Sequence, residues 1–368
     1  MRILQSDHAS RVANGQAVIK AIMAANAPLS RAEMARELGL SKQTLSEITG
    51  LLEQADWIQE VGRKQGALGR AAVSYQLNVD VNYAIGVIFE GQRYTAGLAD
   101  MRGNLRATKS GLLSANAIND GFAFCEHLSS LVQGLVADAK VSLERVGTLV
   151  MGFPGIVDQV NMRVRDANNL PALVGLDLPQ AMSERFDFAV QVDNDLNLHA
   201  YGEYRFGCSQ RTSSSVFIGV GSGIGMGIML GDALWRGAQG GAGEIARLPL
   251  NREPQAPEAQ RLGALEHALS QTLDNAAGLN DAARMDAIAR DCAFAIACIA
   301  PVLEPEIVVL GGPLGDHPQL HARLPDWLHR FSKVNIAVRR SALGTNAGLL
   351  GAVATGIQAI QGKLFRRA

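Results

Sequence analysis

The chain has 368 residues, of which 48% are hydrophobic and 19% are charged. This composition excludes an intrinsically disordered chain and supplies enough apolar material for two or three packed units. The formal net charge is −1, which excludes a strongly basic nucleic-acid binder, so any affinity for DNA must come from a local patch.

The targeting and redox signals point to a cytoplasmic protein. Polar and charged residues interrupt the opening segment MRILQSDHASR, so no signal peptide is predicted. The longest apolar runs, 293–303 and 347–360, are too short for a bilayer, and we expect them to be buried helices with no membrane partner. The cysteines show no Cys-x-x-Cys pair and indicate reduced thiols: Cys125, Cys208, Cys292 and Cys298.

Short helices joined by a glycine turn are predicted in the first 78 residues. An apolar stripe over residues 18–25 has helical spacing and ends before a proline. Ser30 and Glu33 have the spacing of a capping box that opens a second helix. Gly39 suits the tight turn that follows, and Ser41 can cap the third helix. This arrangement is typical of a helix-turn-helix.

The third helix has a polar face that suits base recognition. With Leu45, Ile48 and Leu52 pointing inward, the opposite face displays polar side chains. A glutamine can pair bidentately with adenine, and a glutamate can accept a hydrogen bond from cytosine. The residues expected to contact DNA from this helix are Ser41, Lys42, Gln43, Thr44, Ser46 and Glu47.

A glycine-rich basic loop over residues 62–70 follows, and then an alternating strand over 73–77. Its cations Arg63, Lys64 and Arg70 predict a wing that contacts the DNA backbone or minor groove. A small helical bundle with a solvated loop is the alternative. The order of helices and wing favours DNA binding.

Beyond this head the pattern changes to strands. We expect strands over 83–89, 94–100 and 105–110, a helix over 121–139 and a strand over 146–151. A sheet meander, a helix and a strand, followed by a similar second half, indicate a bilobal α/β body.

Several motifs of the body resemble, in order, those of the ROK family (repressors, open reading frames and kinases for sugars). They are GFPGIVD at 152–158, NNLP at 168–171, VDNDLN at 192–197, GSGIGMG at 221–227, GGAGEI at 240–245, VLGGP at 309–313 and the closing 348–354.

The resemblance implies an α/β chain: an N-terminal winged helix-turn-helix plus a bilobal, actin-like ATPase (ribonuclease H-like) domain. The expected units are the head at 1–78, lobe 1 at 79–195 joined by the C-terminal helix 346–368, and lobe 2 at 196–345. It also implies a homodimer or homotetramer.

The kinases of this family carry Asp-x-Gly-Gly-Thr at the first β-hairpin. Here Ile88 replaces the Asp, Glu90 replaces a Gly, and Gln92 replaces the Thr. An apolar side chain cannot serve magnesium, and a carboxylate about 4 Å from a phosphate charge costs on the order of 4 kcal/mol at an effective dielectric of 20. We therefore expect no enzyme activity and no cofactor, with Asp195 as a vestigial base. A sugar kinase with a DNA-binding appendage is the alternative.

The resemblance also implies a carbohydrate site in which carboxylates and amides bind sugar hydroxyls. Each of these residues taken alone could equally be a turn or cap residue. The glycine loop at 219–227 could be a vestigial phosphate cradle, although a tight hairpin in close packing is the favoured interpretation. The expected sugar-binding residues are Pro154, Gly155, Asn169, Asn194, Asp195, Glu244, Arg247 and Glu266.

The structural zinc of this family is not expected here. Arg247 stands where the family has a histidine ligand, and Ala264 stands where it has its last cysteine. His267 is then a lone imidazole at a surface or helix end. Two interpretations of Arg247 stay open: it binds an anionic sugar, or it pairs with Glu244 and fills the space of the zinc loop.

These observations together predict a sugar-responsive transcriptional regulator, a repressor that binds a double-stranded DNA operator. Its body would bind a carbohydrate effector without phosphorylating it. A regulator without a small-molecule ligand, whose body serves only to dimerise, is a further possibility.

Overall fold

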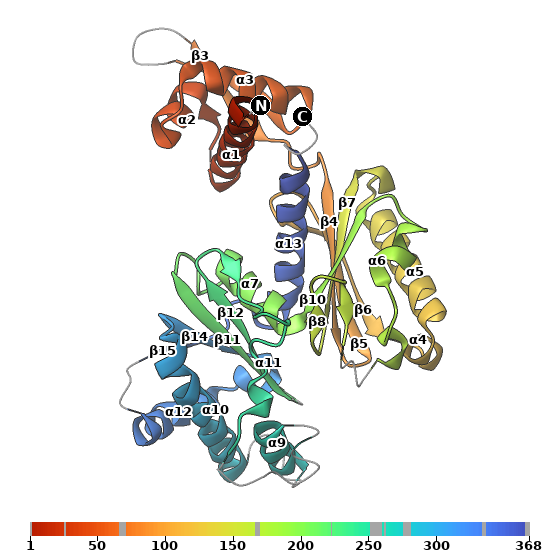
Figure 1. The fold of residues 1–368 in the computed structure, drawn as a ribbon, viewed down its shortest axis with the longest axis vertical. Helices are drawn as coiled ribbons and strands as arrows, with labels where there is room; N and C mark the ends of the chain where they lie inside the picture. Colours follow the sequence, from red (N-terminus) through yellow and green to blue (C-terminus); the bar gives the residue numbers. More distant parts are fainter. Residues whose placement is uncertain are drawn as a thin grey trace.

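A computed structural model shows a small head above a two-lobed body (Figure 1). The structure describes residues 2–25, 27–65, 71–165, 170–221, 223–250, 260, 263–274, 281–332 and 336–364, and their side chains except at 2–9, 11, 63–65, 71–72 and 272–274. Among the described residues, the main sheets are a three-stranded sheet in the head and a five-stranded sheet in each lobe.

The head is a winged helix-turn-helix, as predicted. The Ser30 Oγ accepts a hydrogen bond from the Glu33 N–H (3.3 Å), and the Glu33 carboxylate accepts one from the Ser30 N–H (2.7 Å), which confirms the capping box. Gly39 ends the second helix with a φ of 65°, and the Ser41 Oγ caps the third helix at 3.0 Å from the Thr44 N. The elements are α1 (Arg2–Ala24), β1 (Leu29–Ser30), α2 (Arg31–Leu38), α3 (Lys42–Gln54), β2 (Ile58–Gln65) and β3 (Ala71–Leu77).

Lobe 1 is built on a mixed sheet with the order β10-β7-β4-β5-β6. The predicted strands are found with ends that differ by one or two residues, and the predicted helix 121–139 is α5. The strands are β4 (Tyr83–Glu90), β5 (Arg93–Ala99), β6 (Leu105–Leu112), β7 (Val146–Phe153) and β10 (Ala189–Asn194). The helices are α4 (Ala115–Asn119), α5 (Gly121–Ala139) and α6 (Leu178–Ser183), with short elements η1 (Leu143–Arg145), β8 (Val157–Asp158), β9 (Arg163–Val164) and η2 (Pro171–Leu173).

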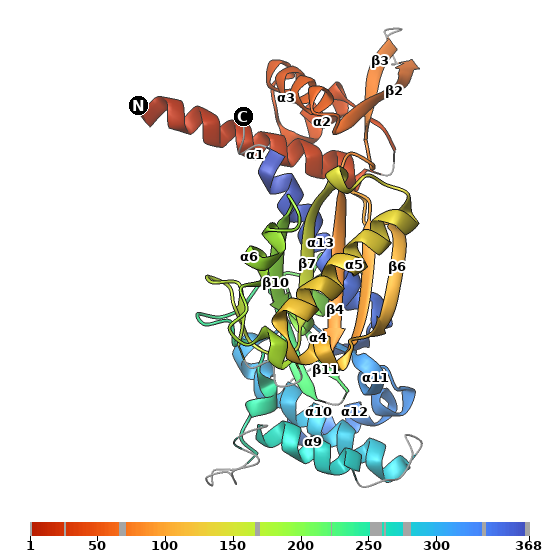
Figure 2. The ribbon, with the colours of Figure 1, turned by 90° about the vertical axis from the view of Figure 1, so that its right-hand side faces the viewer.

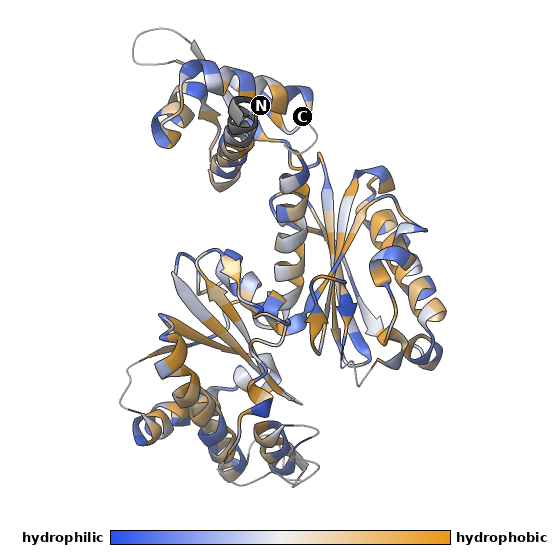
Figure 3. Ribbon diagram, in the orientation of Figure 1, coloured by the Kyte–Doolittle hydropathy of each residue, from blue (hydrophilic) through white to orange (hydrophobic). Residues whose placement is uncertain are grey.

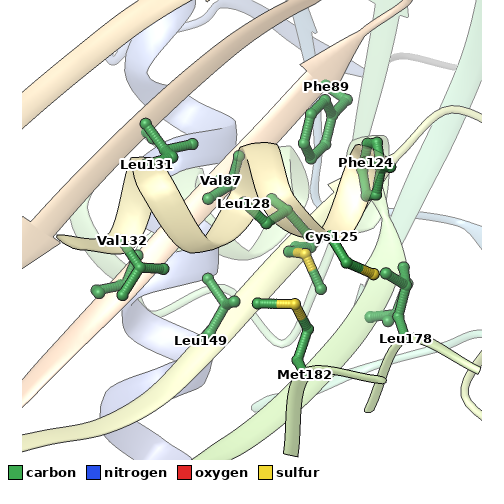
Figure 4. Close-up of a cluster of buried hydrophobic side chains, with 14 of the residues drawn as sticks. Val87, Phe89, Phe124, Cys125, Leu128, Leu131, Val132, Leu149, Leu178 and Met182 are labelled. Carbon is green, nitrogen blue, oxygen red and sulfur yellow. The ribbon is translucent and has the colours of Figure 1, made fainter. Parts of the chain in front are cut away.

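The core of lobe 1 lies between this sheet and α5 (Figure 4). Phe89 of β4 stacks on Phe153 of β7 with ring centroids 4.8 Å apart, and Phe124 of α5 packs beside them. Cys125 is buried in the same cluster as a free thiol. Burial of these large apolar side chains stabilises the lobe and fixes the ends of β7 and β10.

Lobe 2 repeats the strand order, β13-β12-β11-β14-β15, so each sheet runs third, second, first, fourth, fifth in chain order. This repetition is the pattern of a bilobal, ribonuclease H-like chain, and it confirms the expected fold class. The strands are β11 (Ser214–Val220), β12 (Ile224–Leu230), β13 (Ala233–Leu234), β14 (Ile307–Gly311) and β15 (Ala337–Arg340). The other elements are η3 (Ile245–Arg247), α9 (Ala264–Asp274), α10 (Ala282–Leu303), α11 (Gly312–Gly315), α12 (Pro318–Phe331) and η4 (Gly344–Asn346).

The apolar runs at 293–303 and 347–360 lie in α10 and in α13 (Ala347–Leu364), as expected for buried helices. Figure 3 shows hydrophobic residues along α10 and the strands it covers. None of the helices within the described ranges is both long and apolar enough to cross a bilayer.

Two helices packed through glycines join the lobes. α7 (Asp195–Phe206) lies against α13, and both lie between the two sheets (Figure 1). A Cβ on Gly351 would be 1.8 Å from the Leu198 carbonyl oxygen, and one on Gly202 would be 2.0 Å from the Ala347 carbonyl oxygen. Since only glycine allows this approach, the two backbones move as one unit.

The head sits on the far end of α13, where α1 crosses it (Figure 2). Ile19 and Ile22 of α1 share one hydrophobic cluster with Ile357 and Ile360 of α13. Arg102, from the turn between β5 and β6, donates hydrogen bonds to the carbonyls of Met23 (3.4 Å) and Ala25 (3.3 Å). The head is therefore packed against the body rather than tethered by a free linker.

Candidate functional site

The exposed face of α3 is the candidate nucleic-acid interface. Leu45, Ile48 and Leu52 are buried, and Gln43, Ser46 and Glu47 are exposed on the opposite face. The exposed face of α3 is therefore the one that the spacing of its hydrophobic residues predicted.

The start of α3 presents a cation beside the cap. Ser41 and Lys42 are exposed, whereas Thr44 is half-buried and its hydroxyl lies 2.8 Å from the Ser41 Oγ. Thr44 thus contributes to the cap, whereas Lys42 is free of any cap role in the helix start that the structure describes, and its contact with a phosphate stays a prediction.

The predicted wing is a β-hairpin in which β2 pairs antiparallel with β3. Arg63 and Lys64 lie in β2, but their side chains fall outside the described residues, as does the whole of Arg70. The wing therefore has the predicted backbone, and its cation contacts stay predictions.

The first hairpin of the body places a buried apolar side chain near Asp195. Ile88 is 4% exposed, and a Cβ on Gly152 would lie 2.6 Å from its Cδ1 and 3.3 Å from the Asp195 Cα. An apolar side chain thus fills the place beside Asp195 where the kinases of the resembling family carry a carboxylate. Glu90 and Arg93 are opposite each other in the register of β4 and β5, and Gly91, in the turn between them, has a φ of 62°.

The start of α7 holds the central residues of the candidate sugar site. The Asn194 Oδ1 caps α7 by accepting a hydrogen bond from the Asn197 N–H (3.0 Å), and its Nδ2 donates to the Gly155 carbonyl (3.0 Å). Asn194 therefore has the structural role that the cap alternative assigned to it. Through the same bond it fixes the segment Pro154–Gly155 beside Asp195.

Asp195 is the first residue of α7 and is partly buried. The pKa of its carboxyl is raised to about 6, mainly by burial and in part by the Glu90 carboxylate, against the opposing effects of the His199 ring and the Leu196 N–H. A carboxylate whose proton equilibrium lies close to neutrality can accept a hydrogen bond from a sugar hydroxyl or take its proton.

The second glycine loop packs against α7. Cβ atoms on Gly219 and Gly225 would each lie 2.5 Å from a methyl group of Leu196, and one on Gly227 would lie 2.3 Å from the Leu196 carbonyl oxygen. Because backbone and side chain of α7 fill this space, the close-packing interpretation accounts for these glycines.

Glu244, Arg247 and Glu266 belong to lobe 2, where Glu244 lies near both Arg247 and Glu266. The Arg247 Nε lies 3.9 Å from the Glu244 carboxylate, and the Arg247 side chain is 58% exposed. This ion pair favours the pairing interpretation of Arg247, although such an exposed pair is weak. Burial raises the pKa of Glu266, and the neighbouring Glu244 carboxylate raises it further. Asn169 lies outside the described residues.

The structure adds one charge pair that the sequence analysis missed. Asp193 is almost fully buried at the end of β10, and Arg236, just after β13, binds it from the other lobe. A carboxylate inside an apolar strand was a signal of a buried partner, but nothing in the sequence identified Arg236 as that partner.

The residues that stand where the resembling family binds zinc do not fit a metal. The guanidinium of Arg247 has no lone pair for zinc. His267 lies in the first half of α9, and its Nε2 is 3.0 Å from the Nε2 of Gln271. Among the described residues, no group of three or more His, Cys, Asp or Glu side chains could hold an ion.

Comparisons with known proteins agree with this architecture. The model of the ROK family matches residues 97–273. The xylose repressor of Bacillus subtilis (strain 168) is 24% identical over 364 residues, which cover 92% of this chain and 93% of that protein. The DNA-binding transcriptional dual regulator NagC of Escherichia coli (strain K12) is 25% identical over 241 residues, 65% of this chain and 58% of that protein.

Among solved structures, a ROK family transcriptional regulator described as a homolog of the E. coli MLC protein has a TM-score of 0.78 at 19% identity and covers 98% of both chains. A ROK hexokinase from Thermus thermophilus has a TM-score of 0.63 at 24% identity and covers 76% of this chain and 99% of its own. The regulator thus matches the head as well as the body, whereas the kinase matches a body-sized part. Residues 97–273 therefore match the ROK family model, and the chain joins them to a winged helix-turn-helix head.

Proposed function

We propose that this chain is a sugar-responsive transcriptional repressor whose body binds a carbohydrate without phosphorylating it. The observation that carries the proposal is the pairing of two features in one chain. The head has an exposed polar recognition face, and the first hairpin of the body places buried Ile88 where a kinase needs a magnesium-binding carboxylate.

The names of the relatives support the same function. Both curated relatives are transcriptional regulators by name, and one is named for xylose. We propose that operator DNA contacts Ser41, Lys42, Gln43, Ser46 and Glu47 of α3 and the cations of the wing. The proposed carbohydrate contacts are Asp195, Glu244 and Glu266, with Pro154, Gly155, Asn169 and Asn194 shaping the site.

Helix packing offers a route from sugar to DNA. Asp195 begins α7, α7 is locked to α13 through Gly202 and Gly351, and α13 carries α1 of the head. A sugar that shifts α7 must therefore shift the seat of the head. For regulation, the sugar must bind the DNA-competent and DNA-incompetent states with different affinity.

We propose that the chain acts as a homodimer or homotetramer on a two-part operator. Two recognition helices must meet major grooves about 34 Å apart or a multiple of that distance. A small rotation of each head would then release one half-site. This gives sugar binding a large effect on repression without a large movement in the body.

A sugar kinase with a DNA-binding appendage is the second candidate. The buried carboxyl of Asp195, with its raised pKa, and the likeness to kinase folds favour it. The two candidates differ in whether ATP is consumed in the presence of sugar.

The test uses the purified full chain. A melting-temperature screen should identify a stabilising sugar, with D-xylose, D-glucose, N-acetyl-D-glucosamine and their acidic derivatives as the panel. Selection from random duplexes should yield an operator whose affinity falls when that sugar is added. ATP-dependent phosphate transfer to the sugar would favour the kinase candidate over the repressor candidate. A lack of any thermal shift would leave the body as a dimerisation module only.

Arg247 is tested by the same panel. Because it pairs with Glu244, we expect calorimetry to show binding of neutral sugars. Binding restricted to acidic sugars or sugar phosphates would instead make Arg247 the reader of an anionic group.

A further inference from the structure

Arg236 and Asp193 form a charge pair across the two lobes. Asp193 is the second-to-last residue of β10 in lobe 1, and Arg236 follows β13 of lobe 2. The Arg236 Nη2 lies 2.5 Å and its Nε 3.1 Å from the Asp193 Oδ2, with side chains 28% and 5% exposed. A guanidinium held by two nitrogens on a buried carboxylate fixes both distance and orientation.

The pair shares its carboxylate with the start of α7. Asp193 also accepts hydrogen bonds from the Asn194 N–H (2.9 Å), the Asn197 Nδ2 (3.1 Å) and the Gln159 Nε2 (3.4 Å). These donors are neutral, whereas Arg236 brings a positive charge to the buried carboxylate. A displacement of Arg236 would therefore disturb the Asp193 carboxylate and, through it, the backbone that positions Asp195.

The same segment that carries Arg236 also carries Glu244 and Arg247. A Cβ on Gly240 would lie 2.2 Å from the Val157 carbonyl oxygen of lobe 1, and one on Gly243 would lie 2.0 Å from the Met226 carbonyl oxygen of lobe 2. The segment is thus clamped to both lobes. A sugar that draws Glu244 inward must move the segment as a unit.

Arg236 lies close to the head as well. It lines a cavity of about 530 Å³ together with Gln16 and Lys20 of α1 and with Thr355 and Gln358 of α13. One side chain therefore borders the lobe junction and the space beneath the DNA-binding head.

We propose that the Arg236–Asp193 pair is the joint that transmits occupancy of the sugar site to the head. The proposal rests on the proposed function and adds its regulation. Arg236 is a positioning residue in this scheme, because it acts through Asp193 and the 235–247 segment and not through contact with the sugar.

The test separates binding from coupling. Arg236→Gln removes the charge, and Arg185→Gln is the matched control, because Arg185 makes a 2.8 Å pair with Glu126 inside lobe 1. Calorimetry measures the affinity for D-xylose and for N-acetyl-D-glucosamine. Fluorescence anisotropy measures the affinity for a duplex selected by the wild-type protein, with and without each sugar.

We expect sugar to weaken DNA binding by the wild-type protein roughly 5–150-fold, the usual range of allosteric coupling. In Arg236→Gln this ratio should fall to less than about twofold while sugar affinity changes by less than about threefold, and Arg185→Gln should keep the wild-type ratio. If the glutamine variant does not fold, Arg236→Lys and Asp193→Asn are used in its place in the same measurements. The lysine variant should keep part of the coupling, because it retains charge without the fork.

Unchanged coupling in Arg236→Gln would overturn the joint and leave the repressor function intact. A wild-type protein that binds DNA but shows no effect of these two sugars or of any other sugar in the panel would sink the sugar-responsive function itself, and the joint with it.

Discussion

Helices α3 and α7 begin with the same kind of side-chain cap but differ in how far they are buried. Ser41 caps α3 and Asn194 caps α7, in each case by accepting a hydrogen bond from the N–H three residues later. One face of α3 is exposed to solvent, whereas residues 197–203 of α7 are all buried between α13 and lobe 2.

This difference in burial separates the helix proposed to read DNA from the helix proposed to transmit sugar binding. The exposed face of α3 can change without loss of the fold, because only its apolar stripe packs on the head. α7 has no free face over its middle turns, so a ligand at its first residue acts on everything packed around it.

Alanine at one glycine in each helix should show the largest contrast. Gly202→Ala in α7 places a methyl group against the Ala347 carbonyl, so the free energy of unfolding should fall by about 3 kcal/mol or more. Gly50→Ala in α3 meets nothing within 4 Å and should stabilise by about 0.5–1 kcal/mol. Urea unfolding measures both. Equal effects would show that α7 is not locked to α13.

The reading role of α3 is tested at Gln43. Gln43→Ala should weaken binding to the selected operator by about 1–3 kcal/mol and relax base preference at one position, because a bidentate contact is lost. The melting temperature should not change, since Gln43 is exposed. Anisotropy against single-base operator variants measures this. An equal loss for every sequence would assign Gln43 to the DNA backbone instead.

The partly buried carboxyl at the start of α7 should make stability depend on pH. The pKa of Asp195 is raised from 3.8 to about 6 in the folded protein, so ionisation favours the unfolded state. The wild-type protein should therefore lose stability relative to Asp195→Asn as pH rises from about 4 to about 6. The difference should reach about 3 kcal/mol above that window. Unfolding titrations at several pH values measure it, and a constant difference would contradict the raised pKa.

The smallest expected effect belongs to Lys42. Lys42→Ala should weaken DNA binding similarly across sequences and lower the slope of log affinity against log salt by about 1. Affinity measured over a salt series provides the readout. Loss of sequence preference without a change of slope would place Lys42 at a base rather than at a phosphate.

The head could be predicted closely because its signals are local. The capping box at Ser30, the positive φ at Gly39 and the stripe of Leu45, Ile48 and Leu52 each depend on residues within a few positions of one another. The stripe at 18–25 indicated only the last part of α1, which begins at Arg2, because the preceding residues are polar and lack that spacing.

For the candidate sugar site, the sequence supplied the identities of the expected residues but not their geometry. The family resemblance pointed to Asp195, Glu244 and Glu266, yet the cap role of Asn194, the filling of the hairpin by Ile88 and the 3.9 Å pair of Arg247 and Glu244 needed the fold. Of these contacts, the one between Ile88 and Gly152 joins segments tens of residues apart, which no short-range pattern encodes, whereas the Asn194 cap and the Arg247–Glu244 pair each span three residues.

The sequence by itself determined the helix-turn-helix and the strands of lobe 1, because each follows from local chemistry, whereas the interpretation of Ile88 as the replacement of a magnesium-binding carboxylate rests on the family resemblance. Only the tertiary structure decided that α7 and α13 meet backbone to backbone and that α1 rests on α13. It also decided that Arg236 reaches the buried Asp193. These features arise from the packing of distant segments, in which close approach and desolvation select the partners.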